Sequence, residues 1–110
     1  MTGVKFLADK IGICGFSVSG HCSENGDDEE GKIVCSAVSS AVYMAANTVT
    51  EIIGDKANIE ERDGFLKFSV SSPSRETYKI LAGLKLHLTE LSLQYSNNIT
   101  INGGAKYVKD

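Results

Sequence analysis

Alternation of apolar and polar side chains with a two-residue period predicts five β-strands along the chain. In the second strand, for example, Phe16 and Val18 share one face while Ser17 falls on the other. Short turn signals at Asp9-Lys10 and Asp63-Gly64 join two consecutive pairs of strands, so we expect two hairpins. The predicted strands cover residues 2–8, 11–20, 57–61, 64–71 and 98–102.

Two longer segments carry apolar residues at the three- and four-residue spacing of amphipathic helices. The first covers residues 33–53 and is expected to end at Gly54, and its small alanines would let it lie close to a sheet. The second opens at Ser72-Pro73, because proline is tolerated at the first position of a helix. The apolar rows are Val34, Val38, Val42, Ala46 and Val49, with Ala37, Ala41 and Ala45 beside them, in the first helix, and Tyr78, Leu81, Leu84, Leu88, Leu91 and Tyr95 in the second.

The order of these elements predicts an α+β fold. We expect a two-layer α/β sandwich, with a mostly antiparallel sheet and two helices on one face, in the order ββαββαβ. This order disfavours a purely parallel sheet, since parallel strands need long crossover connections. A chain of 110 residues is large enough for one hydrophobic core but not for two, so residues 1–110 form a single predicted domain.

Composition and charge narrow the possible partners and environments. The odd set of three cysteines does not suggest a disulfide framework, so a reducing, cytoplasmic location is expected. We find no signal peptide and no apolar run long enough to cross a membrane, so no membrane partner is expected. A net charge of −3 argues against direct nucleic-acid binding, which depends on a basic face, and suits a basic partner.

The stretch from Gly20 to Ser39 carries the candidate chemistry. It combines a strand end bearing His21, a polar loop over residues 22–32 with four consecutive acids at 27–30, and a helix start bearing Cys35. A cysteine near a helix N-terminus meets the positive end of the helix dipole, which favours the thiolate. Thiolate and imidazole together are the minimum set for nucleophilic catalysis by cysteine, although this sequence separation does not itself bring them together.

Gly20-His21, the glycine-bearing loop and Ile33-Val-Cys-Ser-Ala-Val-Ser39 resemble the signature of the Prp family of ribosomal-processing cysteine proteases. The resemblance implies a small cytoplasmic endopeptidase that removes the N-terminal extension of a large-subunit ribosomal protein. It assigns His21 and Cys35 as the catalytic dyad, with no cofactor and no metal. The further residues expected to bind substrate or to assist are Ser39, Gly20, Gly31, Asp27 and Asp28.

This resemblance implies a mechanism in which the Cys35 thiolate attacks the scissile carbonyl and His21 moves the proton. Backbone N–H groups at the helix start are candidates for the oxyanion hole. The 22–32 loop would close over an extended substrate that is apolar before the cleaved bond and basic after it, and the acids at 27–30 would suit the basic side. Two departures from the family pattern are Lys32, where an aspartate is usual, and a longer loop.

Other interpretations stay open at this point. The chain could be a non-catalytic module of the same fold that binds a ribosomal protein or a ribosome-assembly intermediate, or a redox-sensing thiol domain. A zinc site built from Cys14, His21, Cys22 and Cys35 is disfavoured, because the spacing lacks the paired cysteine knuckles of structural zinc sites.

Four residues of the two helices carry predictions of their own. Ser39 lies one helical turn after Cys35, where its hydroxyl could assist the thiol, bind substrate or bond back to a helix carbonyl. Leu86 and Leu93 form an apolar line opposite the core stripe of the second helix, and with the family resemblance this predicts a homodimer. His87 is expected to be a surface residue.

Overall fold

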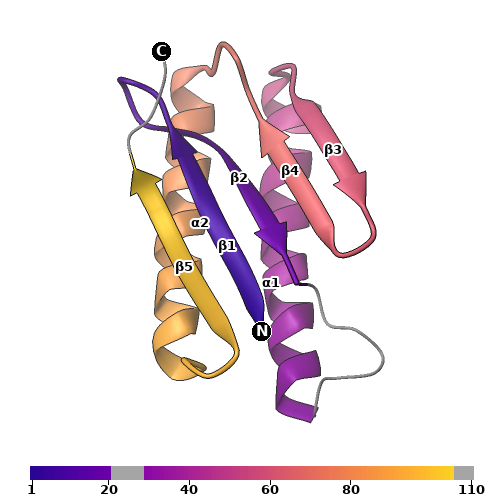
Figure 1. Cartoon of the computed structure of the whole chain (residues 1–110). Coiled ribbons are helices and arrows are strands. Elements are labelled where there is room, and N and C mark those ends of the chain that lie inside the picture. Colours follow the sequence, from indigo (N-terminus) through magenta and orange to yellow (C-terminus); the bar gives the residue numbers. More distant parts are fainter. Residues whose placement is uncertain (21–28, 106–110) are drawn as a thin grey trace.

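The computed structural model describes residues 1–20 and 29–105 and contains the predicted elements in the predicted order (Figure 1). The strands are β1 (Thr2–Ala8), β2 (Ile13–Ser19), β3 (Asn58–Arg62), β4 (Phe65–Ser69) and β5 (Ile99–Ala105). The helices are α1 (Glu29–Asn47), which continues into a π-helical segment η1 (Thr48–Ile53), and α2 (Arg75–Gln94).

The five strands form a single sheet in the order β3-β4-β2-β1-β5. The pairs β1–β2, β2–β4 and β3–β4 are antiparallel, and β5 joins the outer side of β1 in parallel. Both helices lie on the same face of the sheet (Figure 1). The prediction of a two-layer α+β sandwich with a mostly antiparallel sheet is therefore confirmed.

The core lies between the sheet and the two helices. Phe16 of β2 and Phe68 of β4 are register partners, and their rings stack with centroids 5.3 Å apart. The predicted strand alternation is confirmed, because Phe16, Val18 and Leu66 are buried on the helix side. The helices add their apolar rows to the same core, with Val34, Val38, Val42, Ala45 and Val49 from α1 and η1 and Leu81, Leu84 and Leu88 from α2.

Helix α1 begins four residues earlier than the sequence predicts. Residues 29–32 were assigned to the polar loop because they lack apolar periodicity, yet they form the first turn of the helix. Glu29 and Glu30 are favourable there because acidic side chains complement the positive end of the helix dipole. The predicted end at Gly54 is confirmed: this glycine has a φ of 90°, and its N–H donates to the Val49 carbonyl at 2.9 Å.

Helix α2 begins at Arg75, after Pro73 rather than with it. Its first turn is held by Asp55, which lies just after η1. Carboxylate oxygen Oδ2 of Asp55 accepts hydrogen bonds from the Ser74 N–H at 2.8 Å, the Ser74 hydroxyl at 3.0 Å and the Thr77 hydroxyl at 2.6 Å. These bonds, chiefly those from the Ser74 N–H and Thr77, hold the pKa of Asp55 below its usual value. Asp55 thus ties the end of one helix to the start of the other.

The continuous segment Glu29–Ile53 is long and apolar enough, by length and composition, to cross a membrane. The sequence expectation that no such run exists is therefore wrong. In this fold the buried residues of the segment pack into the core between helix and sheet. The core helix of a folded domain passes the same test of length and composition, so this one segment is weak evidence for a membrane span.

Candidate functional site

Gly20 ends β2 in a conformation that only glycine adopts easily. Its φ is 72°, and a Cβ placed there would lie 2.5 Å from the Met1 carbonyl oxygen. Its N–H donates to the Gly64 carbonyl at 3.0 Å, which extends the pairing of β2 with β4. Gly20 therefore fixes the point at which the chain leaves the sheet. His21, Cys22, Asp27 and Asp28 lie outside the described residues.

Cys35 lies in the second turn of α1 and is only 7% exposed. The sequence placed it at the helix start, but the helix begins at Glu29, six residues earlier. At 1.5 Å per residue this separates the helix start from Cys35 by about 9 Å. Cys35 therefore does not lie at the helix end, where the sequence placed it, but almost two turns further along.

Gly31 is buried in the first turn of α1, one turn before Cys35. Lys32, by contrast, is exposed on that turn. The first turn of α1 thus buries Gly31 and leaves Lys32 exposed to solvent.

Ser39 follows Cys35 by one turn on the same flank of α1 and is half-buried. Two threonines near the end of this helix bond back to helix carbonyls: Thr48 donates to Met44 at 2.7 Å and Thr50 to Ala46 at 3.2 Å. Within residues 1–20 and 29–105, the Ser39 hydroxyl makes no such bond. This leaves the hydroxyl available for assisting the thiol or binding substrate.

Tyr43 continues the same flank one turn further along α1. Its hydroxyl donates to carboxylate oxygen Oε2 of Glu61 in β3 at 2.9 Å, which raises the pKa of Tyr43 above its usual value. The sequence analysis did not select either residue. One feature of the sequence could have pointed to Tyr43: it lies outside both apolar rows of the helix, so its aromatic ring was not expected to pack in the core.

Cys14 is the other cysteine that the structure describes. It sits where the pairing of β1 with β2 shifts, since Leu7 pairs with Gly15 and Ala8 with Ile13. Burial raises the pKa of its thiol, and the nearby Asp9 carboxylate raises it further. Both effects oppose formation of a thiolate, so Cys14 is the poorer nucleophile candidate of the two.

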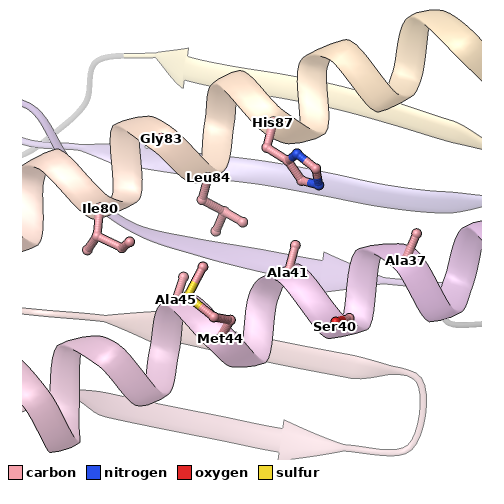
Figure 2. A pocket seen from close by; sticks show the side chains of 9 residues that line it. All are labelled: Ala37, Ser40, Ala41, Met44, Ala45, Ile80, Gly83, Leu84 and His87. Atoms are coloured by element: carbon pink, nitrogen blue, oxygen red, sulfur yellow. The ribbon is translucent and has the colours of Figure 1, made fainter.

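A groove of about 610 Å³ runs between α1 and α2 (Figure 2). Its α1 side combines the alanine row, which the sequence predicted to lie close to the sheet, with Ser40 and Met44, and its α2 side includes Gly83 and His87. Side chains from the two helices point towards one another across it (Figure 2). Ala37 follows Cys35 by two residues, or about 200° around the helix, so the groove opens on the opposite flank from the cysteine. His87 is exposed, as predicted.

No group of three potential metal ligands occurs among the residues that the structure describes. Of the four residues weighed as zinc ligands, Cys14 lies at the strand shift of β2 and Cys35 within α1, and the other two fall outside the described part. The described geometry therefore offers no support for the zinc interpretation.

The fold and the buried helical cysteine define a small α+β domain with a candidate thiol site. The model of the cysteine protease Prp family matches residues 1–100 of the chain. The chain therefore belongs to the Prp family of cysteine proteases, as the sequence resemblance implied. No match was found among curated proteins.

Solved structures share the fold at low sequence identity. The essential ribosomal processing protease Prp of S. aureus in complex with a substrate peptide has a TM-score of 0.82 at 20% identity, covering 93% of this chain and 98% of its own. The same S. aureus protease with a covalently linked product peptide has a TM-score of 0.77 at 23% identity, with the same coverage. The protein SMU.848 of Streptococcus mutans has a TM-score of 0.78 at 20% identity, covering 93% of this chain and 96% of its own.

Proposed function

We propose that this protein is a cysteine endopeptidase that removes the N-terminal extension of a large-subunit ribosomal protein. The observation that carries the proposal is the family match over residues 1–100, which contains the Gly20-His21 pair, Cys35 and Ser39 in that order. The S. aureus relative of the same fold is a ribosomal processing protease that was solved with a substrate peptide, which supports the same kind of substrate here.

In the proposed mechanism, His21 takes the proton of the Cys35 thiol and the sulfur attacks the scissile carbonyl carbon. The resulting tetrahedral intermediate collapses, the C–N bond breaks, and the imidazolium gives its proton to the leaving amine. Water then hydrolyses the thioester and restores the thiol. Ser39, one turn along the helix, is placed to assist at the thiol or to contact the substrate.

The proposed substrate is basic, and the protein carries a net charge of −3. Asp27 and Asp28 belong to the acidic run that would suit the basic side of the substrate. We place the reaction in the cytoplasm, where the ribosomal protein is made and where free thiols persist. The same acidic balance argues against a direct contact with nucleic acid.

We also propose that the protein is a homodimer that uses the outer face of α2. Leu86 is 61% exposed and Leu93 is 78% exposed, and both lie on the face of the helix that points away from the core. Burying such a line against a second copy removes apolar surface from water. Light scattering that finds only the 11.8 kDa species at micromolar concentration would contradict this proposal.

Incubation with an N-terminally extended large-subunit ribosomal protein, followed by intact-mass spectrometry, tests the enzyme function. The wild type should shorten the N-terminus, Cys35→Ala should abolish the cut, and His21→Ala should reduce it strongly. Cys14→Ala is the matched control and should retain the activity. Binding of the precursor without any cut by the wild type would favour the non-catalytic module instead.

A further inference from the structure

Strand β3 forms an open edge of the sheet. It pairs only with β4, and all five of its residues are exposed. In an antiparallel pair, every second residue directs its N–H and C=O away from the partner strand. An open edge of this kind is a template for another extended chain.

Two backbone hydrogen bonds at the ends of the β2–β4 pairing determine which residues of β3 point outward. The Gly20 N–H donates to the Gly64 carbonyl, and the Val70 N–H donates to the Cys14 carbonyl. These bonds show that the even-numbered residues of β4 direct their backbone groups to β2, so the odd-numbered ones face β3. The partners of the even-numbered Leu66 and Phe68 are Glu61 and Ile59. Glu61 and Ile59 therefore present their backbone groups to solvent.

The charges on β3 favour a basic strand over a second copy of this chain. Glu60 is the central residue of the strand. Antiparallel pairing of two copies over the full strand would place Glu60 directly opposite its own counterpart, and like charges in that position are destabilising. The edge thus disfavours self-association, whereas an extended segment carrying lysine or arginine would complement it.

Glu61 holds a fixed negative charge on this edge. Its carboxylate is positioned by the Tyr43 hydroxyl at 2.9 Å. Within residues 1–20 and 29–105, the ion pair found is that of Arg62 with Glu60, so no cation from this part of the chain neutralises Glu61. A carboxylate that is already oriented loses less side-chain entropy when it binds a cation.

The Tyr43–Glu61 bond joins this edge to the flank of α1 that carries Cys35. Ser39 and Tyr43 follow Cys35 at four-residue intervals, so each is turned only about 40° from the one before. Eight residues of helix correspond to about 12 Å, the length of about four residues of extended polypeptide. A substrate lying along this flank from the thiol would reach the Tyr43–Glu61 pair after roughly that many residues.

We propose that the β3 edge and the Tyr43–Glu61 pair form a docking track for an extended, basic segment of the substrate. The segment adds as a strand to Ile59 and Glu61, and its lysine or arginine side chain, four or more residues from the cleaved bond, pairs with Glu61. This inference rests on the proposed peptidase function, and it assigns specificity to residues that do not touch the reacting atoms.

The test uses synthetic peptides that span the extension junction of the ribosomal protein. One peptide has three residues on each side of the cleaved bond, and the others are extended on either side by four residues containing lysine. Glu61→Gln keeps an acceptor for Tyr43 but removes the charge. The Glu61→Gln variant should raise KM about three- to five-fold for the extended peptide that reaches the edge, without changing kcat. Its kcat and KM for the short peptide should equal those of the wild type. Glu76→Gln, on the exposed first turn of α2 and away from the Leu86–Leu93 line, is the charge-matched control.

The backbone contact is tested with Ile59→Pro against Ile59→Ala. Proline removes an outward N–H and leaves the β3–β4 pairing in place, which an edge strand tolerates. Ile59→Pro should raise KM for the same extended peptide, Ile59→Ala should not, and thermal melts should show that both remain folded. If Glu61→Gln and Ile59→Pro cleave the extended peptides as the wild type does, the docking track is wrong. If the wild type cuts no peptide and no precursor, the proposed peptidase function fails instead.

Discussion

Replacing Gly20 by alanine should destabilise the protein more than the same replacement at Gly64. The two glycines have almost the same backbone conformation, with φ values of 72° and 74°. A Cβ at Gly64 would meet nothing within 4 Å, whereas a Cβ at Gly20 would lie 2.5 Å from the Met1 carbonyl oxygen. Comparing the two variants therefore separates the cost of the left-handed conformation from the cost of the contact.

The conformational cost is shared by both variants. A non-glycine residue in the left-handed region costs about 1–2 kcal/mol. The loss of chain entropy in the unfolded state offsets part of this cost, about 0.4–1 kcal/mol, and does so equally at the two positions. At Gly20 the backbone of Met1 must also move, and overpacking of this kind costs about 1–3 kcal/mol. Gly20→Ala should therefore lose about 1–3 kcal/mol more unfolding free energy than Gly64→Ala.

Urea denaturation followed by circular dichroism measures both free energies of unfolding, and cleavage of the ribosomal precursor measures the consequence for the site. Because Gly20 sets where the chain leaves the sheet, Gly20→Ala should lower kcat/KM even at temperatures where it is fully folded. Gly64→Ala should not. Equal losses of stability in the two variants would refute the argument that the Met1 carbonyl excludes a side chain at Gly20.

Three other outcomes follow from the structure. Phe68→Ala should cost about 3–5 kcal/mol of unfolding free energy in urea denaturation, because Phe68 is fully buried and stacks on Phe16; a loss below 1 kcal/mol would contradict this packing. Asp55→Asn should lower the melting temperature at pH 7. The pKa of Asp55 is lowered from 3.8 in the folded state, so its stabilising contribution is present above that value and is lost as the pH falls through the folded pKa. The difference in melting temperature between variant and wild type should therefore shrink by about pH 2, and it would not change with pH if Asp55 did not cap α2. Iodoacetamide at pH 6.5 should modify Cys35 ahead of Cys14, as read by peptide mass spectrometry, because burial and Asp9 oppose the Cys14 thiolate; the reverse order would contradict the assignment of the nucleophile.

The features that the sequence predicted correctly are those with short-range causes. Alternation in β2 and β4 and the two-residue turn at Asp63-Gly64 depend on neighbours only, and the turn glycine has the positive φ that the motif requires. The apolar row of α2 likewise follows from helical spacing, and Leu81 and Leu88 are fully buried. Local patterns of this kind were sufficient to give the fold class.

The features that the sequence missed depend on partners far along the chain. Asp55 caps α2 across 19 residues to Ser74, and no spacing rule connects the two. The first turn of α1 is stabilised by acidic side chains at a helix end rather than by burial, so residues 29–32 show no apolar period to recognise. The hydrogen bond between Tyr43 and Glu61 joins a helix to a strand edge, and only the packing of α1 across the sheet brings them together.

The position of Cys35 within its helix changes where its activation has to come from. A cysteine at a helix end would be activated by the helix itself, but in the second turn that contribution is weak. In the proposed mechanism the proton acceptor is His21. His21 directly follows Gly20 in the sequence. Gly20 is held by its N–H bond to the Gly64 carbonyl, and the Met1 carbonyl oxygen leaves no room for a Cβ there. The motif glycine, which touches no substrate atom in the proposed mechanism, thus sets the starting point from which the imidazole must reach the thiol.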